Sequence, residues 1–364
     1  MRIDFKGRLV DEQQVRAGFI GCGSHSFRNL YPTFQFAPVA LAATCDLSLE
    51  KAQAFAAKFG APAAYCDHRK MLETEKLDCV FLCTGYDSAG RPTYPALAAE
   101  CLQAGLHVWM EKPLAASCAE IEAMQSLADA AGKNVMVGLK KMFFPANEKA
   151  RSLMDEADFG RPTLATLQYP QYVPTVAELD RYRKGEKVNG AVTFLDHLCH
   201  PASVLLLLLG MPHEMHYRRS ATGAGVVTFG FAGGAVASLA LTHGSSRVGG
   251  MERTTIVSDR GQHIVVDNNV RVTLYRGTPP GYGDKPDFYT TPAAQTAAYW
   301  EPEFSLGQLY NKGLFLLGYY GEVNEFARSI LDRRPPAKGT LRHAWQVTRI
   351  FEAFAQGEGR NVTL

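Results

Sequence analysis

Short apolar runs alternate with segments of helical periodicity over roughly the first 140 residues of the chain. The runs have the length and apolar content of buried strands, and they cover residues 15–20, 39–45, 79–84, 106–110 and 135–138. The helical segments cover residues 30–36, 49–59, 68–76, 94–104 and 118–131. Because neighbouring parallel strands need a crossover connection, this alternation predicts an α/β domain, residues 1–140, with a doubly wound parallel sheet.

Residues at the segment ends support this assignment. Ser48 precedes the second helical segment, where its hydroxyl can cap the first turn, and Gly60 follows that segment as a helix stop. Ser117 and Glu120 have the spacing of a capping box, and Gly132 ends the helix that they begin.

The pattern changes after residue 140. Strand-like runs now follow one another with short turns between them, at residues 163–169, 214–220, 225–231, 235–242, 254–257, 263–266 and 271–275. Helices are expected at residues 145–156, 202–209, 320–331 and 341–356, and a long loop at residues 277–302. Consecutive strands on short loops pair antiparallel, so residues 141–364 are predicted to form an α+β domain with a largely antiparallel sheet.

Composition excludes several classes of partner. The net charge is +2 and basic residues are scattered, which predicts no nucleic-acid or membrane-surface partner. The longest aliphatic stretch, residues 204–209, is far shorter than the roughly 18 residues of a spanning helix, and residues 1–6 lack the apolar core of a signal peptide. Eight cysteines at no framework spacing read as reduced thiols, so a cytoplasmic protein without a metal site is expected.

A glycine turn follows the first predicted strand. Gly21 and Gly23 permit a tight turn and close approach of the backbone to a pyrophosphate, although Ser26 stands where a third glycine is usual. Asp46 ends the second predicted strand, where an acid hydrogen-bonds the adenosine ribose and repels a 2′-phosphate. These residues predict NAD rather than NADP as the cofactor, with NADP still open; the alternatives are a glycine turn without a ligand and an aspartate that only caps a helix.

Lys112 follows the strand-like residues 106–110 in the tripeptide Glu111-Lys112-Pro113. The proline biases the lysine away from helical backbone, which holds Lys112 extended at the carboxyl end of a strand. Ligands bind at that edge of open α/β sheets, so Lys112 is expected to face the bound dinucleotide.

These residues together resemble the Gfo/Idh/MocA family, named for glucose-fructose oxidoreductase and inositol dehydrogenase. The resemblance covers most of the chain, and the motifs that carry it are Gly21-Cys22-Gly23, Cys45-Asp46, Glu111-Lys112-Pro113, Val137-Gly138 with Phe144-Pro145, Asp196 with His200, and Gly318-Tyr319-Tyr320-Gly321-Glu322. It implies an N-terminal Rossmann domain that binds a nicotinamide cofactor. It also implies a C-terminal domain that forms a substrate wall and the interface of a homodimer or homotetramer.

In that family the lysine of Glu-Lys-Pro and an Asp-x-x-x-His pair form the catalytic set, which the resemblance carries onto Lys112, Asp196 and His200. Oxidation of a secondary alcohol needs a base whose pKa is near neutrality, and His200 would supply it. Lys112 would stabilise the developing alkoxide, and Asp196 would orient His200.

Alternatives remain for the second domain. A histidine four residues from an aspartate is often only a pair on a helix face, and Pro201 allows a helix to start between them. His197 competes with His200 for the role of base.

The expected binding residues follow from these motifs. Those expected to bind the cofactor are Gly21, Gly23, Ser24, His25, Ser26, Asp46, Thr84, Gly85, Tyr86, Glu111 and Lys112. Those expected to bind substrate are Lys112, Lys140, Lys141, Tyr172, His197 and His200. Residues 84–94 are longer than the family's usual turn, and Lys140-Lys141 is either a contact for substrate or a solvated charge pair.

The predicted function is an NAD(P)-dependent dehydrogenase that acts on the secondary alcohol of a sugar, polyol or sugar derivative. One alternative is an NAD-dependent glycosidase or lyase that uses transient oxidation. Another is a non-catalytic dinucleotide sensor, which the complete set of Lys112, Asp196 and His200 disfavours.

Overall fold

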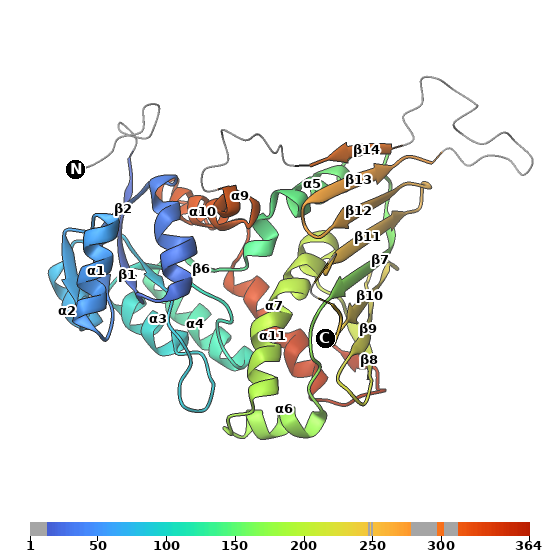
Figure 1. The fold of residues 1–364 in the computed structure, drawn as a ribbon, viewed down its shortest axis with the longest axis horizontal. Coiled ribbons are helices and arrows are strands. Elements are labelled where there is room, and N and C mark those ends of the chain that lie inside the picture. The colour runs from blue at the N-terminus through green and yellow to red at the C-terminus, as the bar shows by residue number, and fades with distance from the viewer. Residues whose placement is uncertain (1–12, 247, 249, 278–296, 302–311) are drawn as a thin grey trace, which may run out of the picture. The chain divides into compact units, whose positions relative to one another are not determined.

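The computed structural model describes residues 13–246, 248, 250–277, 297–301 and 312–364. These residues form two compact units (Figure 1). The first comprises Met1–Phe143 with Gly313–Thr348, and the second Phe144–Lys312 with Arg349–Leu364. The expected division near residue 140 assigns Gly313–Thr348 to the second domain, whereas this segment belongs to the first unit.

The first unit contains a six-stranded parallel sheet, which confirms the predicted doubly wound arrangement. The strand order is β3-β2-β1-β4-β5-β6. The strands are β1 (Val15–Ile20), β2 (Val39–Cys45), β3 (Ala63–Tyr65), β4 (Cys79–Leu82), β5 (His107–Met110) and β6 (Val135–Val137). The helices are η1 (Ser26–Leu30), η2 (Tyr31–Gln35), α1 (Leu49–Phe59), α2 (His68–Thr74), α3 (Tyr94–Gln103), α4 (Cys118–Ala131), η3 (Lys140–Phe143), α9 (Lys312–Leu316), α10 (Tyr319–Leu331) and the start of α11 (Leu341–Phe354).

Aromatic side chains fill the centre of the first unit. Phe19, Phe81 and Trp109 lie on the adjacent strands β1, β4 and β5, and all three are fully buried. Phe326 of α10 meets the Phe81 ring edge-on, with ring centroids 5.3 Å apart. This contact secures α10, a late segment of the chain, against the sheet.

Local chemistry explains several helix ends. The Ser48 hydroxyl accepts the Lys51 N–H at the start of α1, and Gly60 ends that helix with a left-handed φ of 79°. The Ser117 hydroxyl likewise accepts the Glu120 N–H at the start of α4. These caps lie where the sequence predicts them.

The helix after the glycine turn differs from the prediction. It covers most of the predicted residues 30–36 but begins earlier, at Ser26, and it is a π-helix, η1, continued by a 3-10 helix, η2. The Tyr31 N–H donates to the Ser26 carbonyl, five residues back, and Pro32 has no N–H to continue that pattern. Strand β3, of three residues, was also not predicted.

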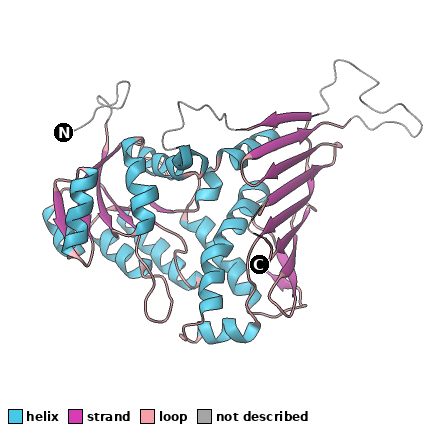
Figure 2. Ribbon diagram, in the orientation of Figure 1, coloured by secondary structure: helices cyan, strands magenta, loops and turns pink. Residues whose placement is uncertain are grey.

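The second unit contains a nine-stranded mixed sheet, which confirms the largely antiparallel prediction (Figure 2). Its order is β14-β13-β12-β11-β7-β10-β9-β8-β15, and only the pairing of β7 with β10 is parallel among its described strands. The strands are β7 (Pro162–Tyr169), β8 (Glu214–Arg219), β9 (Gly225–Gly230), β10 (Val236–Leu241), β11 (Arg253–Ser258), β12 (His263–Asp267), β13 (Arg271–Tyr275), β14 (Ala297–Trp300) and β15 (Val362–Thr363). Helices α5 (Pro145–Met154) and α7 (Asn189–Leu209) pack against one face of this sheet, and α6 (Val176–Arg183) packs on α7.

Helix α7 corrects two expectations. It begins at Asn189 rather than at residue 202, so Asp196 and His200 both lie inside one helix and do not straddle a helix start. Pro201 is also inside it, where it removes the N–H that would otherwise bond to the His197 carbonyl. By length and composition, α7 is apolar enough to cross a membrane, with a mean hydropathy of 1.6, but 61% of that stretch is buried as in a core helix.

Helix α6 and strands β14 and β15 were not predicted. Strand β14 lies inside the expected loop of residues 277–302, and most of the rest of that range is outside the described residues.

Candidate active site

The glycine turn joins β1 to η1 at the carboxyl end of the sheet. Gly21 has a φ of 114°, and a Cβ there would lie 2.1 Å from the Cys83 carbonyl oxygen at the end of β4. Gly23 is exposed, and a Cβ there would meet nothing within 4 Å. Close strand packing therefore requires Gly21, whereas Gly23 leaves open space above an exposed backbone.

Ser26 lies inside the turn, fully buried. Its hydroxyl accepts the Gly23 N–H at 3.0 Å and lies 2.9 Å from the carbonyl oxygens of Gly21 and Gly23. Through these contacts Ser26 holds the glycine turn closed, which explains a serine at this position. Ser24, by contrast, is exposed beside Gly23.

Asp46 connects the end of β2 to the glycine turn. One carboxylate oxygen accepts the Cys22 N–H at 2.9 Å, and the other accepts the Ser48 N–H at 3.0 Å. The carboxylate is half-buried and adjoins the turn. Asp46 thus holds the glycine turn through a hydrogen bond and places a carboxylate beside it.

A hydrogen bond between Glu111 and His25 joins the Glu-Lys-Pro tripeptide to the glycine turn. His25 Nε2 lies 2.9 Å from Glu111 Oε1, and the Lys112 N–H donates to Glu111 Oε2 at 3.0 Å. Burial raises the pKa of Glu111, but the hydrogen bond and charge of His25, with the charges of Lys112 and Lys140, outweigh it and lower the pKa. Glu111 is thus an ionised anchor for the backbone of Lys112.

The two lysines that follow β6 are not a solvated pair. Lys140 Nζ donates to Tyr319 Oη at 2.7 Å and lies 4.6 Å from the centroid of the same ring. Lys141 is buried, with 4% of its surface exposed.

Residues 84–94 form a small closed turn after β4. Tyr86 bridges to Pro92, and the Asp87 carboxylate accepts the Arg91 N–H at 2.8 Å. Thr84 Oγ1 lies 2.8 Å from Thr93 Oγ1 at its base. The side chain of Tyr86, within this turn, is exposed.

Helix α7 carries the polar residues expected to be catalytic. Asp196 lies 3.5 Å from His197 Nε2, and Tyr169 Oη lies 3.4 Å from the other nitrogen of that ring. The ring centroids of His197 and His200 are 6.1 Å apart, and those of Tyr169 and His200 are also 6.1 Å apart. The second unit therefore brings together Asp196, both histidines and Tyr169, and the sequence did not reveal that Asp196 contacts His197.

Packing accounts for Tyr172. Its hydroxyl donates to Glu178 at 3.0 Å, and Glu178 is part of the capping box of α6. Gly223 has a φ of 94°, and a Cβ there would lie 2.3 Å from the Tyr172 ring. Tyr172 is thus wedged between these elements, and the structure explains it without a ligand.

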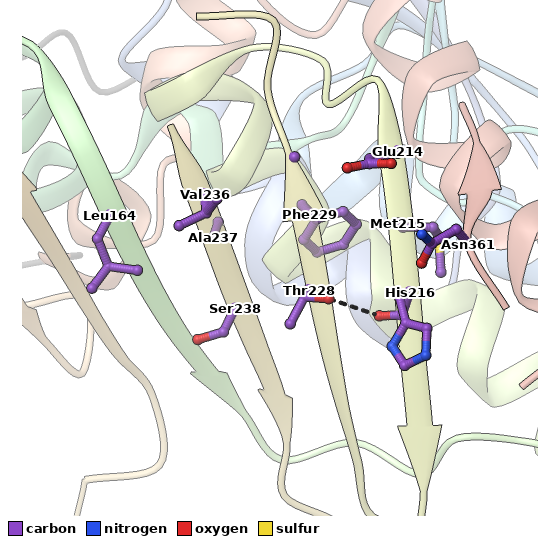
Figure 3. A pocket seen from close by; sticks show the side chains of 11 residues that line it. Leu164, Glu214, Met215, His216, Thr228, Phe229, Val236, Ala237, Ser238 and Asn361 are labelled. Carbon is purple, nitrogen blue, oxygen red and sulfur yellow. Dashed lines mark hydrogen bonds between the residues drawn. The ribbon is translucent and has the colours of Figure 1, made fainter. Parts of the chain in front are cut away.

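The face of the second sheet opposite α5 and α7 has exposed, uncharged side chains on its central strands. Leu164, Val226 and Val236 are 39%, 52% and 51% exposed. A hollow of about 300 Å³ lies over β8, β9 and β10 (Figure 3). Its lining includes Leu164 and Val236 but no residue predicted to bind cofactor or substrate.

All eight cysteines are free, and six of them are buried. Among the residues that the structure describes, no group of three or more His, Cys, Asp or Glu side chains is arranged to hold a metal ion.

The parallel sheet with its glycine turn and the mixed-sheet second unit define a two-domain, dinucleotide-binding α/β protein. Residues 15–139 match the model of the oxidoreductase family with an NAD-binding Rossmann fold, and residues 147–263 match that of the GFO/IDH/MocA C-terminal domain. The chain belongs to the Gfo/Idh/MocA oxidoreductase family.

Several characterised enzymes are similar to parts of the chain. D-xylose 1-dehydrogenase (NADP(+)) 2 of Haloferax volcanii is 27% identical over 203 residues, which cover 55% of this chain and 58% of the relative. Trans-1,2-dihydrobenzene-1,2-diol dehydrogenase of Sus scrofa is 31% identical over 146 residues, covering 40% of this chain and 41% of the relative. The chain thus matches about half the length of these relatives.

Solved structures share the fold over nearly the whole chain. A dehydrogenase from Chromobacterium violaceum has a TM-score of 0.77 at 19% identity, covering 95% of this chain and 96% of that one. GenD2 from gentamicin A biosynthesis, in complex with NAD, has a TM-score of 0.71 at 20% identity and covers 100% and 99%.

Proposed function

We propose that this protein is an NAD-dependent dehydrogenase that transfers hydride between a secondary alcohol of a sugar, polyol or sugar derivative and the nicotinamide. The observation that carries the proposal is the open space over Gly23, flanked by Asp46 and by the Glu111–His25 pair that anchors Lys112. The names of the relatives from Haloferax volcanii and Paraburkholderia graminis, a D-xylose and a D-apiose dehydrogenase, favour a sugar-like alcohol.

The residues of the first unit fit a dinucleotide. The backbone at Gly23 and Ser24 is exposed at the start of a helical segment, where N–H groups attract a pyrophosphate. Asp46 would accept the ribose hydroxyls with the lone pairs that Cys22 and Ser48 leave free. Its negative charge favours NAD over NADP, whereas the Haloferax relative is named for NADP(+).

Bound nicotinamide would supply the hydride acceptor. Lys112 would place its ammonium group beside the alcohol oxygen and stabilise the alkoxide charge that develops as hydride leaves carbon. His200 would take the hydroxyl proton, and Asp196 would stabilise the imidazolium that results. His197 is the alternative base because Asp196 contacts it.

Replacing Lys112 with methionine tests the proposal. Lys112→Met removes the charge and keeps much of the side-chain length, so NAD binding should persist while kcat falls by roughly 100-fold or more. The assay follows reduced nicotinamide in a screen of sugars, inositols and sugar acids with NAD and NADP. Near-normal turnover of the variant would refute the role of Lys112. Glycoside cleavage without accumulation of NADH would instead support the hydrolase alternative.

The sheet of the second unit supports a homo-oligomer. Exposed Leu164, Val226 and Val236 form an uncharged surface on strands that are paired on both edges, which a second copy of the chain would bury. Val236→Lys should shift sedimentation towards a monomer, and an unchanged sedimentation coefficient would exclude this face. The eight free thiols favour a reducing compartment such as the cytoplasm.

A further inference from the structure

Glu322 is a buried carboxyl group without a hydrogen-bonding partner. It lies in the first turn of α10 with 0% of its surface exposed, and neither carboxyl oxygen has a partner among the described residues. Its backbone N–H is satisfied by the Gly318 carbonyl. An ionised carboxylate in such a place would carry a desolvation cost that no contact offsets, so Glu322 holds a proton in the folded protein.

The charges around Glu322 reinforce this assignment. Burial and then the charge of Glu111 raise the pKa of Glu322, while Lys140 opposes them. Lys140 is held by Tyr319 Oη on the same helix, and the Tyr319 ring meets the His25 ring edge-on at 5.8 Å. Burial raises the pKa of the Tyr319 hydroxyl, and the positive charge of Arg28 opposes that rise.

Glu111 has the opposite environment, although it is buried nearby. Two donors hold its carboxylate, His25 Nε2 at 2.9 Å and the Lys112 N–H at 3.0 Å, and its pKa is lowered as described above. The environments of Glu111 and Glu322 therefore separate their protonation states: Glu111 is ionised and Glu322 is protonated.

We propose that Glu322 is a positioning residue for Lys112: as a neutral acid it leaves Glu111 the single ionised carboxylate that holds the Lys112 backbone and the His25 side chain. Ionisation of Glu322 would place a second negative charge beside Glu111 in a low-dielectric interior. Glu111 would then take up a proton or move, and it would release Lys112 and the glycine turn together. This role rests on the proposed dehydrogenase function, because it acts through Lys112.

The test compares wild type with Glu322→Gln, which has nearly the same shape and is permanently neutral. At pH 7 the two proteins should have the same NAD affinity and the same kcat/KM within about threefold. As the pH rises above 7, NAD affinity and kcat/KM of wild type should fall on an alkaline limb that is absent from, or at least about one pH unit higher in, the Gln variant. Alkaline limbs that coincide would overturn the proposal.

Glu325→Gln is the matched control. Glu325 lies almost one turn later on α10, where its carboxylate accepts Arg334 Nη1 at 2.7 Å and the Ala337 N–H at 2.7 Å. Glu325→Gln should lower stability without shifting the alkaline limb. A shifted limb would show that the effect is not specific to Glu322, which would contradict the proposal. If Glu322→Gln does not fold, Glu322→Met provides the same neutral comparison.

The NAD titration separates this role from the proposed reaction. A protein whose NAD affinity has the expected pH dependence but which oxidises no alcohol would contradict the dehydrogenase and support the linkage of Glu322 to the site. A working dehydrogenase whose pH profiles of NAD affinity and kcat/KM do not change in Glu322→Gln would support the dehydrogenase and contradict the role of Glu322.

Discussion

Replacing each glycine of the turn with alanine should affect a different property: Gly21→Ala should lower stability, and Gly23→Ala should lower NAD affinity. Gly21→Ala places a Cβ 2.1 Å from the Cys83 carbonyl oxygen at a φ of 114°, so the ends of β1 and β4 must separate by about 1 Å. Backbone strain of about 1–3 kcal/mol and overpacking of about 1–3 kcal/mol give a destabilisation of about 2–6 kcal/mol. At about 2–4 °C per kcal/mol, the melting temperature should fall by roughly 4–24 °C.

Gly23→Ala meets no atom within 4 Å and needs no left-handed backbone. Its stability should remain within about 0.5 kcal/mol of wild type. The added methyl group would occupy the space proposed for the pyrophosphate, so NAD affinity should fall at least about tenfold, which is about 1.4 kcal/mol.

Thermal unfolding followed by circular dichroism, and NAD titration followed by tryptophan fluorescence, measure the two effects separately. A Gly23→Ala protein that binds NAD as tightly as wild type would show that the pyrophosphate does not lie over this turn. A Gly21→Ala protein with an unchanged melting temperature would contradict the steric argument for Gly21.

Three further substitutions test the site and the fold. Asp46→Asn removes the charge and keeps an oxygen acceptor for one of the two N–H groups that Asp46 accepts, so the NADP-to-NAD affinity ratio should rise about tenfold by fluorescence titration; an unchanged ratio would remove Asp46 from the ribose site. Replacing the base with asparagine should lower kcat by about 100-fold or more, so steady-state rates of His200→Asn and His197→Asn assign the role, and a larger loss in His197→Asn would overturn the choice of His200. Burial lowers the pKa of His107 from 6.5 to about 4, and its Nδ1 accepts the Asn134 N–H. The unfolded chain therefore binds the proton first, and stability should fall by about 1.4 kcal/mol per pH unit as the pH drops from 6.5 to about 4. Urea unfolding should show a shallower loss in His107→Asn, and parallel losses would contradict this.

Several elements with local chemical signals were predicted from the sequence, although α6 was missed despite its capping box, and the short strands defined by pairing were not predicted. Helix α1 has a serine cap and a glycine stop, so both of its ends were predicted to the residue. Strands β3 and β15 have three and two residues, and only their hydrogen bonds to β2 and β8 define them. Helix α7 was predicted too short because Asp196, His197 and His200 interrupt its apolar pattern, although apolar residues such as Phe194 and Leu198 bury its other side.

The candidate site divides in the same way. Its residue types were visible as the glycine turn, Asp46, the Glu-Lys-Pro tripeptide and the aspartate and histidines of residues 196–200. Their partners were not visible, since His25 and Glu111 are 86 positions apart and Asp196 contacts the nearer histidine. The structure also shows that Ser26 and Tyr172 are held by contacts within the fold, which no local sequence pattern indicates.

Caps, stops and the alternation of apolar runs act within a few residues, so the chain's own order of amino acids indicated many of its helices, its parallel sheet and the edge at which a ligand would bind. The order of the strands brings the ends of β1, β4 and β5 together, and that juxtaposition decides why Gly21 must lack a side chain and why Glu111 is ionised. Burial and charge depend on residues far apart in the chain, which is why the proton on Glu322 is a property of the folded protein alone.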